Sequence, residues 1–124
     1  MKFLLVDDSG TMRRIIGRTL IKLGYSDVIG AENGQEALEQ LEKEDVGFVI
    51  TDWNMPVMNG LKLVQNIRAG KHKHLPILMV TTNGSKDDIV QALKAGINNY
   101  VIKPMTAEDL QDKIKGMMAD SSIV

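Results

Sequence analysis

The sequence predicts an α/β fold in which helices cover both faces of a doubly wound parallel sheet of five strands. Short apolar runs alternate with segments of helical periodicity along the chain, which is the pattern of repeated βα units. The third, fourth and fifth runs are apolar nearly throughout, as in strands that helices cover on both faces. Right-handed crossovers between such strands produce a parallel sheet.

The first two βα units follow from apolar runs and from apolar residues at helical spacing. Residues 3–6 predict the first strand, and the helix after it ends near Gly24. Residues 28–31 predict a weak second strand, and a second helix follows Gly34. The apolar residues of these two helices are Met12, Ile15, Ile16, Leu20 and Leu23, then Ala37, Leu38 and Leu41.

The last three βα units have clearer turn and helix-capping residues at their boundaries. Strands are predicted at residues 47–51, 77–80 and 100–102, and a turn-rich loop at 54–60 follows the first of them. Ser85 and Thr106 are placed to cap the last two helices, and Gly96 to end the fourth helix. The apolar residues of these helices are Leu61, Val64 and Ile67, then Ile89, Val90 and Leu93, and finally Leu110, Ile114 and Met117.

Chain length, net charge and residue composition exclude several classes of protein. A chain of 124 residues is long enough for one domain with a real core, so residues 1–124 are predicted to be a single domain. The net charge of −1, with both signs mixed, indicates neither nucleic-acid binding nor a polybasic membrane patch. The absence of cysteine excludes disulfides and thiolate metal sites. No apolar run could span a membrane or serve as a signal segment, so a cytoplasmic location is expected.

Chemically active side chains follow four of the five predicted strands. They are Asp7 and Asp8, Asp52, Thr81 and Lys103. Because the carboxyl ends of parallel strands line one crevice, these side chains are expected to meet. Taken singly, each has an ordinary explanation as a helix cap, a turn residue or a strand exit. Their conjunction at one edge of the sheet favours a functional site.

The residue types at this edge indicate phosphoryl chemistry. Three crowded carboxylates cannot all stay ionised without compensation, and Lys103 supplies only one positive charge. These oxygen ligands suit Mg²⁺. Because the chain has no glycine-rich phosphate loop, the metal would have to help hold a phosphoryl group. Asp52, on the central strand, is the best candidate for a nucleophile that forms an aspartyl phosphate, with Asp7 and Asp8 serving the metal.

The segments around these residues resemble the receiver domain of bacterial response regulators. The similarity covers essentially the whole chain, and within the family it is greatest to the stand-alone chemotaxis regulators. It is carried by residues 6–9, 52–56, 58–60, 80–82, 95–96 and 100–104. The resemblance implies a flavodoxin-like (βα)5 fold with strand order 2-1-3-4-5. It also implies a cis peptide bond between Lys103 and Pro104.

The resemblance further implies roles for the acidic residues and two asparagines. Asp52 would be the phosphoacceptor. Mg²⁺ would be bound directly by Asp8, by Asp52 and by the backbone carbonyl of Asn54, with Asp7 acting through water. Asn54 and Asn83 occupy positions that tune dephosphorylation in the family.

The remaining implied roles concern the response to phosphorylation. Thr81 and Lys103 would each contact a phosphoryl oxygen, and Tyr100 would be an aromatic switch that turns inward when Thr81 moves. Two residues depart from the family pattern. Met105 stands where many relatives have phenylalanine, and Thr82 is bulkier than the usual alanine or serine.

These features predict a regulator whose output is protein binding, not an enzyme beyond its own phosphorylation and dephosphorylation. A chemotaxis histidine kinase is the expected phosphoryl donor, and the flagellar motor switch protein is the expected target. The binding face would comprise the fourth helix, the fifth strand and the fifth helix. A monomer is expected, with a phosphatase as a further potential partner. The alternative is a phosphate sink or a receiver for another pathway.

Two other classes of function are weighed against this one. A Mg²⁺-dependent phosphohydrolase with an Asp nucleophile commonly has a second Asp two residues later. That position is Asn54, whose amide cannot act as an acid or base. In a flavin-binding module, Asp7 and Asp8 would repel the flavin phosphate unless a metal intervened.

Three conspicuous side chains are assigned structural roles. His72 and His74 have no carboxylate or cysteine nearby in the sequence, so they are expected on a solvated loop rather than at a metal. Trp53 is expected to be a partly buried aromatic residue beside the site.

Overall fold

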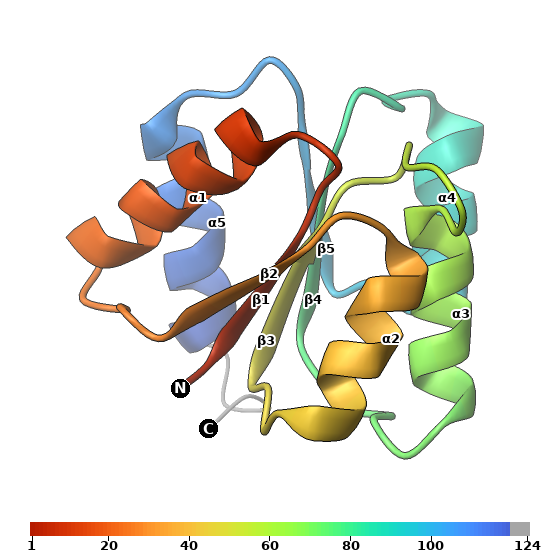
Figure 1. The fold of residues 1–124 in the computed structure, drawn as a ribbon. Helices are drawn as coiled ribbons and strands as arrows, with labels where there is room; N and C mark the ends of the chain where they lie inside the picture. Colours follow the sequence, from red (N-terminus) through yellow and green to blue (C-terminus); the bar gives the residue numbers. More distant parts are fainter. Residues whose placement is uncertain (120–124) are drawn as a thin grey trace.

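The computed structural model describes residues 1–119 and shows a parallel five-stranded sheet between two layers of helices (Figure 1). The strands are β1 (Phe3–Val6), β2 (Val28–Ala31), β3 (Phe48–Thr51), β4 (Ile77–Thr81) and β5 (Asn99–Ile102). Their order across the sheet is β2-β1-β3-β4-β5, and every neighbouring pair is parallel. The predicted fold class and strand order are therefore confirmed.

Each strand is followed by one helix, and Figure 1 shows α1 and α5 on one face of the sheet and α2, α3 and α4 on the other. The helices are α1 (Gly10–Lys22), α2 (Gly34–Lys43), α3 (Gly60–Ala69), α4 (Lys86–Ala95) and α5 (Ala107–Ala119). The predicted caps are present: Ser85 Oγ accepts the Asp88 amide, and Thr106 Oγ1 accepts the Asp109 amide. Within residues 1–119, no helix is long and apolar enough to cross a membrane.

The last two strands extend beyond the apolar runs that predicted them. Thr81 belongs to β4 because its backbone pairs with Ile102 and its carbonyl accepts the Lys103 amide at 2.8 Å. Asn99 belongs to β5 because it pairs with Leu78. Backbone pairing continues through the polar residues at the ends of these strands. A prediction based on apolar runs omits such residues.

The side chains of the central strands alternate between two hydrophobic cores. Phe3 and Leu5 point into the core under α1 and α5, whereas Leu4 and Val6 point into the core under α2, α3 and α4. Full burial of one large apolar side chain stabilises the fold by about 1.5–3 kcal/mol. Burial on both faces explains why β1, β3 and β4 are almost entirely apolar in sequence.

Helix α4 lies where the sequence predicts it, but its apolar residues are not buried as helical periodicity suggests. Its only buried residue is Ala92. Val90 is 39% exposed and Leu93 is 45% exposed, and Ile102 on the neighbouring strand β5 is 38% exposed. The fold therefore leaves an apolar surface over α4 and β5 in contact with solvent.

The loop between β3 and α3 closes tightly over the end of β3. Gly60 donates its amide to the Trp53 carbonyl at 2.8 Å. A Cβ atom at position 60 would clash with the backbone carbonyl of Asp52. Only glycine can therefore occupy this position without displacing the end of β3. The expected cis bond between Lys103 and Pro104, in the loop after β5, is also present.

The loop between β3 and α3 also contains Val57, which has a φ of 68° and is 82% exposed. The Met58 amide donates to the Pro56 carbonyl at 2.7 Å, so Val57 is the central residue of a three-residue γ-turn. A β-branched residue in this backbone region is strained. Its exposed side chain contributes little packing to offset the strain.

Replacing Val57 by asparagine, which tolerates positive φ, should raise the free energy of unfolding by about 1–2 kcal/mol. Urea denaturation of the purified protein measures this difference. The control is Val57→Ile, which keeps the β-branch and should leave stability unchanged. Equal stability of the asparagine variant and wild type would show that the turn is not strained.

Candidate functional site

The carboxyl ends of β1, β3 and β5 bring four of the predicted site residues together. The carboxylates of Asp7, Asp8 and Asp52 form an acidic cluster in which one oxygen atom from each lies within 4.8 Å of the other two. Lys103 Nζ lies 3.3 Å from Asp52 Oδ2 and 3.5 Å from Asp7 Oδ2. Thr81 ends β4 beside them, and its backbone is hydrogen-bonded to Lys103.

Backbone amides fix the two buried carboxylates. Asp7 Oδ1 accepts the Ser9 amide at 2.9 Å, and Asp52 Oδ1 accepts the Trp53 amide at 2.7 Å. In each case one carboxylate oxygen is held by the following loop, and the other faces Lys103. Asp8 differs, because its exposed side chain has no hydrogen bond or ion pair within residues 1–119. Hydrogen bonds therefore fix the carboxylates of Asp7 and Asp52, whereas the Asp8 carboxylate is not held by another described residue.

The charges at this edge of the sheet are not balanced. Asp7 is 3% exposed and Asp52 is 9% exposed, yet Lys103 is the only cation paired with them within residues 1–119. Burial raises the pKa of Asp7 above its ordinary value, although the Ser9 amide and Lys103 act in the opposite direction. An additional cation at the cluster would relieve this excess negative charge.

The donor set fits a hard divalent cation. Three carboxylates offer oxygen ligands within 4.8 Å of one another, and one of them, Asp8, is exposed. Mg²⁺ prefers oxygen ligands and usually keeps several waters, so a partly open site suits it. Within residues 1–119, no other group of three or more acidic, histidine or cysteine side chains is arranged to hold a metal.

Polar side chains from the end of β4 and from the loops after β3 and β4 lie beside the cluster. Thr81 is fully buried, and its hydroxyl accepts the Asn83 amide at 3.0 Å. The side-chain amide nitrogen of Asn54 (Nδ2) in turn donates to the side-chain oxygen of Asn83 at 2.9 Å. The loops after β3 and β4 are thus joined through Asn54 and Asn83, the two asparagines for which the resemblance predicts a role in dephosphorylation.

Tyr100 is half-buried and packs against the core under α2, α3 and α4. Met79 is its partner across the sheet, and Thr81 pairs with Ile102. Because side chains alternate along a strand, Tyr100 and Ile102 share one face of β5, next to Met79 and Thr81 of β4. The predicted switch residues therefore lie near each other diagonally across the two strands.

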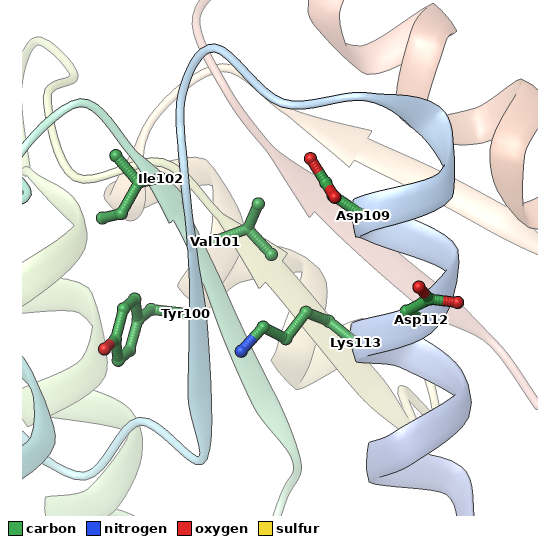
Figure 2. A pocket seen from close by; sticks show the side chains of 6 residues that line it. All are labelled: Tyr100, Val101, Ile102, Asp109, Asp112 and Lys113. Atoms are coloured by element: carbon green, nitrogen blue, oxygen red, sulfur yellow. The ribbon is translucent and has the colours of Figure 1, made fainter.

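A surface groove lies on β5 and α5 near Tyr100, and Figure 2 shows the side chains that line it. Tyr100 and Ile102 extend from one side of β5, and Lys113 reaches toward the strand from α5. The groove is lined by Tyr100, Val101, Ile102, Asp109, Asp112 and Lys113. It adjoins the exposed apolar surface of α4 and β5.

Sequence reasoning missed several contacts that build the site. The amides of Ser9 and Trp53 orient the carboxylates, but any residue supplies an amide. Arg13 binds the Asp7 carbonyl, and nothing in the sequence pattern distinguishes it from other surface arginines. Gly60 was visible in a turn motif, but its close approach to Asp52 depends on the folded loop.

The structural assignments hold for Trp53 and need correction for His72. Trp53 is 7% exposed and belongs to the core under α2, α3 and α4. His72 was expected on a solvated loop, but it is half-buried and its Nε2 atom is enclosed without a hydrogen-bond partner in residues 1–119. His72 lies beside residues of α2 and α3 that line the same pocket, and Arg68 fixes the segment by donating to the His72 carbonyl at 3.0 Å. His74 is exposed, as expected.

Comparisons with known proteins agree with this geometry. The family model described as "Response regulator receiver domain" matches residues 3–115. A chemotaxis protein CheY homolog of Campylobacter jejuni is 54% identical over an alignment that covers 98% of this chain and 95% of that protein.

Two solved structures extend the comparison. The chemotaxis response regulator CheY4 of Vibrio cholerae is 35% identical, with a TM-score of 0.86 over 93% of this chain and 96% of that chain. The receiver domain of the sensor histidine kinase PA1611 of Pseudomonas aeruginosa has a magnesium ion coordinated in its active-site cleft. It is 28% identical, with a TM-score of 0.85 over 96% of this chain and 98% of that chain.

Replacing Asp7 by asparagine should raise the free energy of unfolding by roughly 0.5–2 kcal/mol at pH 7 in EDTA. The folded-state pKa of Asp7 is raised, so wild type loses stability as the pH rises from the unfolded-state pKa to the folded-state pKa, and the full cost remains at higher pH. Below the unfolded-state pKa, at about 3.9, the cost is absent, and the advantage of the variant should shrink as the pH falls toward that value.

Denaturant titrations at several pH values measure this difference. The matched control is Asp45→Asn, which removes an exposed carboxylate from the loop before β3, at the opposite end of the sheet. A clear loss of stability in Asp7→Asn at pH 7 would mean that Asp7 is a structural cap rather than part of a strained acidic site.

Proposed function

The chain belongs to the response regulator receiver domain family, and from this premise we propose that it is a phosphorylation switch in chemotaxis. Receiver domains are regulators rather than conventional enzymes. In this proposal Asp52 accepts a phosphoryl group from a histidine kinase in a Mg²⁺-dependent reaction, and the phosphorylated protein binds its target more tightly. The observation that carries the proposal is the contact of Lys103 with both Asp7 and Asp52, within a cluster that still has excess negative charge.

Asp52 is suited to the role of nucleophile because one of its oxygens is fixed and the other faces the cation. The Trp53 amide holds Oδ1, which orients the carboxylate. In the proposed reaction an Asp52 oxygen forms a bond to phosphorus as the bond from phosphorus to the histidine nitrogen of the kinase breaks. Lys103 then pairs with a phosphoryl oxygen, and the hydroxyl of Thr81 donates to another.

Asp7, Asp8 and Asp52 are the side chains that would hold Mg²⁺, with the Asn54 carbonyl as the further predicted ligand. When bound, Mg²⁺ supplies positive charge that offsets the carboxylates and the phosphoryl oxygens. The exposed Asp8 keeps one side of the cluster open to solvent and to the incoming group. The magnesium-bound relative from Pseudomonas aeruginosa supports this choice of cation.

Asn54 and Asn83 are proposed to set the lifetime of the phosphorylated state. Their side chains are hydrogen-bonded to each other beside the cluster, so they govern how water approaches a phosphoryl group on Asp52. An amide cannot act as a general base. This chemistry favours slow self-dephosphorylation, which a phosphatase could accelerate, over turnover of an external phosphate ester.

The proposed output is binding of a protein, with the flagellar motor switch protein as the target. The exposed apolar side chains of Val90, Leu93 and Ile102 lie on α4 and β5, and Ile102 lines the groove that also contains Tyr100, which supports an interaction face there. Movement of Thr81 toward a phosphoryl group opens space into which Tyr100 can turn. The protein is proposed to act as a cytoplasmic monomer. A phosphate sink is the alternative, and it would need no target.

Incubation with acetyl phosphate and Mg²⁺ should produce one phosphoryl adduct on wild-type protein, visible by intact mass spectrometry. Asp52→Asn preserves the shape of the side chain but removes the nucleophile, so its adduct should be at least tenfold less abundant. EDTA should abolish the adduct on wild type, whereas Asp45→Asn should leave it unchanged. An adduct of equal yield on Asp52→Asn would place the acceptor elsewhere.

Thr81→Ala should keep Mg²⁺-dependent phosphorylation but lose most of the phosphorylation-dependent gain in target affinity. The reason is that alanine removes the hydroxyl that links the phosphoryl group to the space near Tyr100. Calorimetric titration with the motor switch protein, using phosphorylated and free protein, measures the gain. Retention of the full gain by Thr81→Ala would refute the coupling between Thr81 and Tyr100. Absence of any gain in wild type would favour a phosphate sink.

A further inference from the structure

The ammonium of Lys113 lies over the aromatic ring of Tyr100. Its Nζ atom is 5.6 Å from the ring centroid, within the range of a cation–π interaction. The same atom is 3.5 Å from the side-chain oxygen of Asn99, the residue before Tyr100 on β5. Lys113 therefore contacts β5 at two neighbouring residues. Figure 2 shows its side chain reaching from α5 toward this strand.

Lys113 lies on the same helix as two carboxylates that could pair with it. Asp109 lies four residues before Lys113, a spacing at which α-helical side chains commonly form ion pairs. Asp112 lines the same groove. Nevertheless, none of the ion pairs within residues 1–119 includes Lys113. The ammonium is directed to the ring and to Asn99 instead.

The base of the Lys113 side chain is held rigidly. Its neighbour Ile114 is fully buried, and Leu110 and Met117 of the same helix are also buried in the core under α1 and α5. Helix α5 therefore presents Lys113 to β5 from a fixed position. The Tyr100 ring is half-buried, and in the proposed switch it is the partner that moves.

We propose that Lys113 is a positioning residue that holds the Tyr100 ring in its observed place and opposes the switch to the phosphorylated state. The inference rests on the proposed role of Tyr100. A cation–π contact exists only while the ammonium lies over the ring. Rotation of the ring toward the space beside Thr81, on the far side of β5 from α5, removes the contact. Loss of Lys113 should therefore favour the switched position roughly two- to five-fold.

Linkage gives the inference a second consequence. A group that stabilises the unswitched position must weaken binding of any ligand that prefers the switched one, by a factor that can be as large as the shift in the switch equilibrium itself. Removal of Lys113 should therefore strengthen binding of a phosphoryl mimic at Asp52. A nonspecific charge effect has the opposite sign, because removing a cation weakens the attraction for an anion. The direction of the change thus separates the two explanations.

The test uses fluorine NMR of protein labelled with 3-fluorotyrosine. The chain has two tyrosines, and Tyr25, which packs against Phe3 with ring centroids 5.0 Å apart, serves as an internal reference. Beryllofluoride with Mg²⁺ is the phosphoryl mimic. In Lys113→Met without the mimic, the Tyr100 resonance should lie part of the way toward its mimic-bound position. The mimic should bind this variant two- to five-fold more tightly than wild type.

Two control variants complete the experiment. Lys113→Arg keeps a cation that can lie over the ring and should behave as wild type. Lys115→Met removes an exposed cation two residues away and should neither move the resonance nor strengthen mimic binding. If Tyr100 responds to the mimic in wild type but Lys113→Met matches wild type in both measurements, the inference is wrong and the proposed switch stands. If the Tyr100 resonance does not respond to the mimic in wild type, both the proposed role of Lys113 and the proposed switch of Tyr100 are wrong.

Discussion

The contact of Lys103 with two buried carboxylates is the interaction on which the rest of the site depends. Burying Asp7 and Asp52 without a counterion would be prohibitively costly, and Lys103 is the only cation paired with them in the described chain. The contact also joins the end of β5 to the ends of β1 and β3. A change of charge at Asp52 therefore acts directly on the strand that carries Tyr100.

The scaffold holds this cluster in place by tight loops and shared backbone contacts. The Trp53 amide fixes Asp52, and Gly60 lets the following loop pack against the end of β3. In contrast, α4 buries only Ala92, so the surface that would bind a partner belongs to the least anchored helix. A rigid acidic site beside a weakly anchored helix suits a two-state switch. A modest change in free energy at the site can then shift the equilibrium between two positions of the helix surface.

The fold and the membership of the acidic cluster could be predicted because they follow from local patterns. Apolar runs mark the strands, and the polar residue after each run must lie at the same edge of a parallel sheet. Other features depend on packing between distant segments. The exposure of Val90 and Leu93, the enclosure of the His72 ring and the positive φ of Val57 have no signature in periodicity or composition. The contact between Lys113 and Tyr100 likewise appears only when α5 is placed against β5.

The central claim is that Asp52 receives the phosphoryl group within reach of Lys103 and Thr81. A crystal structure of the protein with Mg²⁺ and beryllofluoride tests this claim most directly. The account predicts the beryllium bonded to an Asp52 oxygen, with the Lys103 ammonium and the Thr81 hydroxyl each contacting a fluorine and Mg²⁺ bound at the acidic cluster. Density for the mimic on Asp7 or Asp8, or a Lys103 side chain turned away from it, would contradict the account.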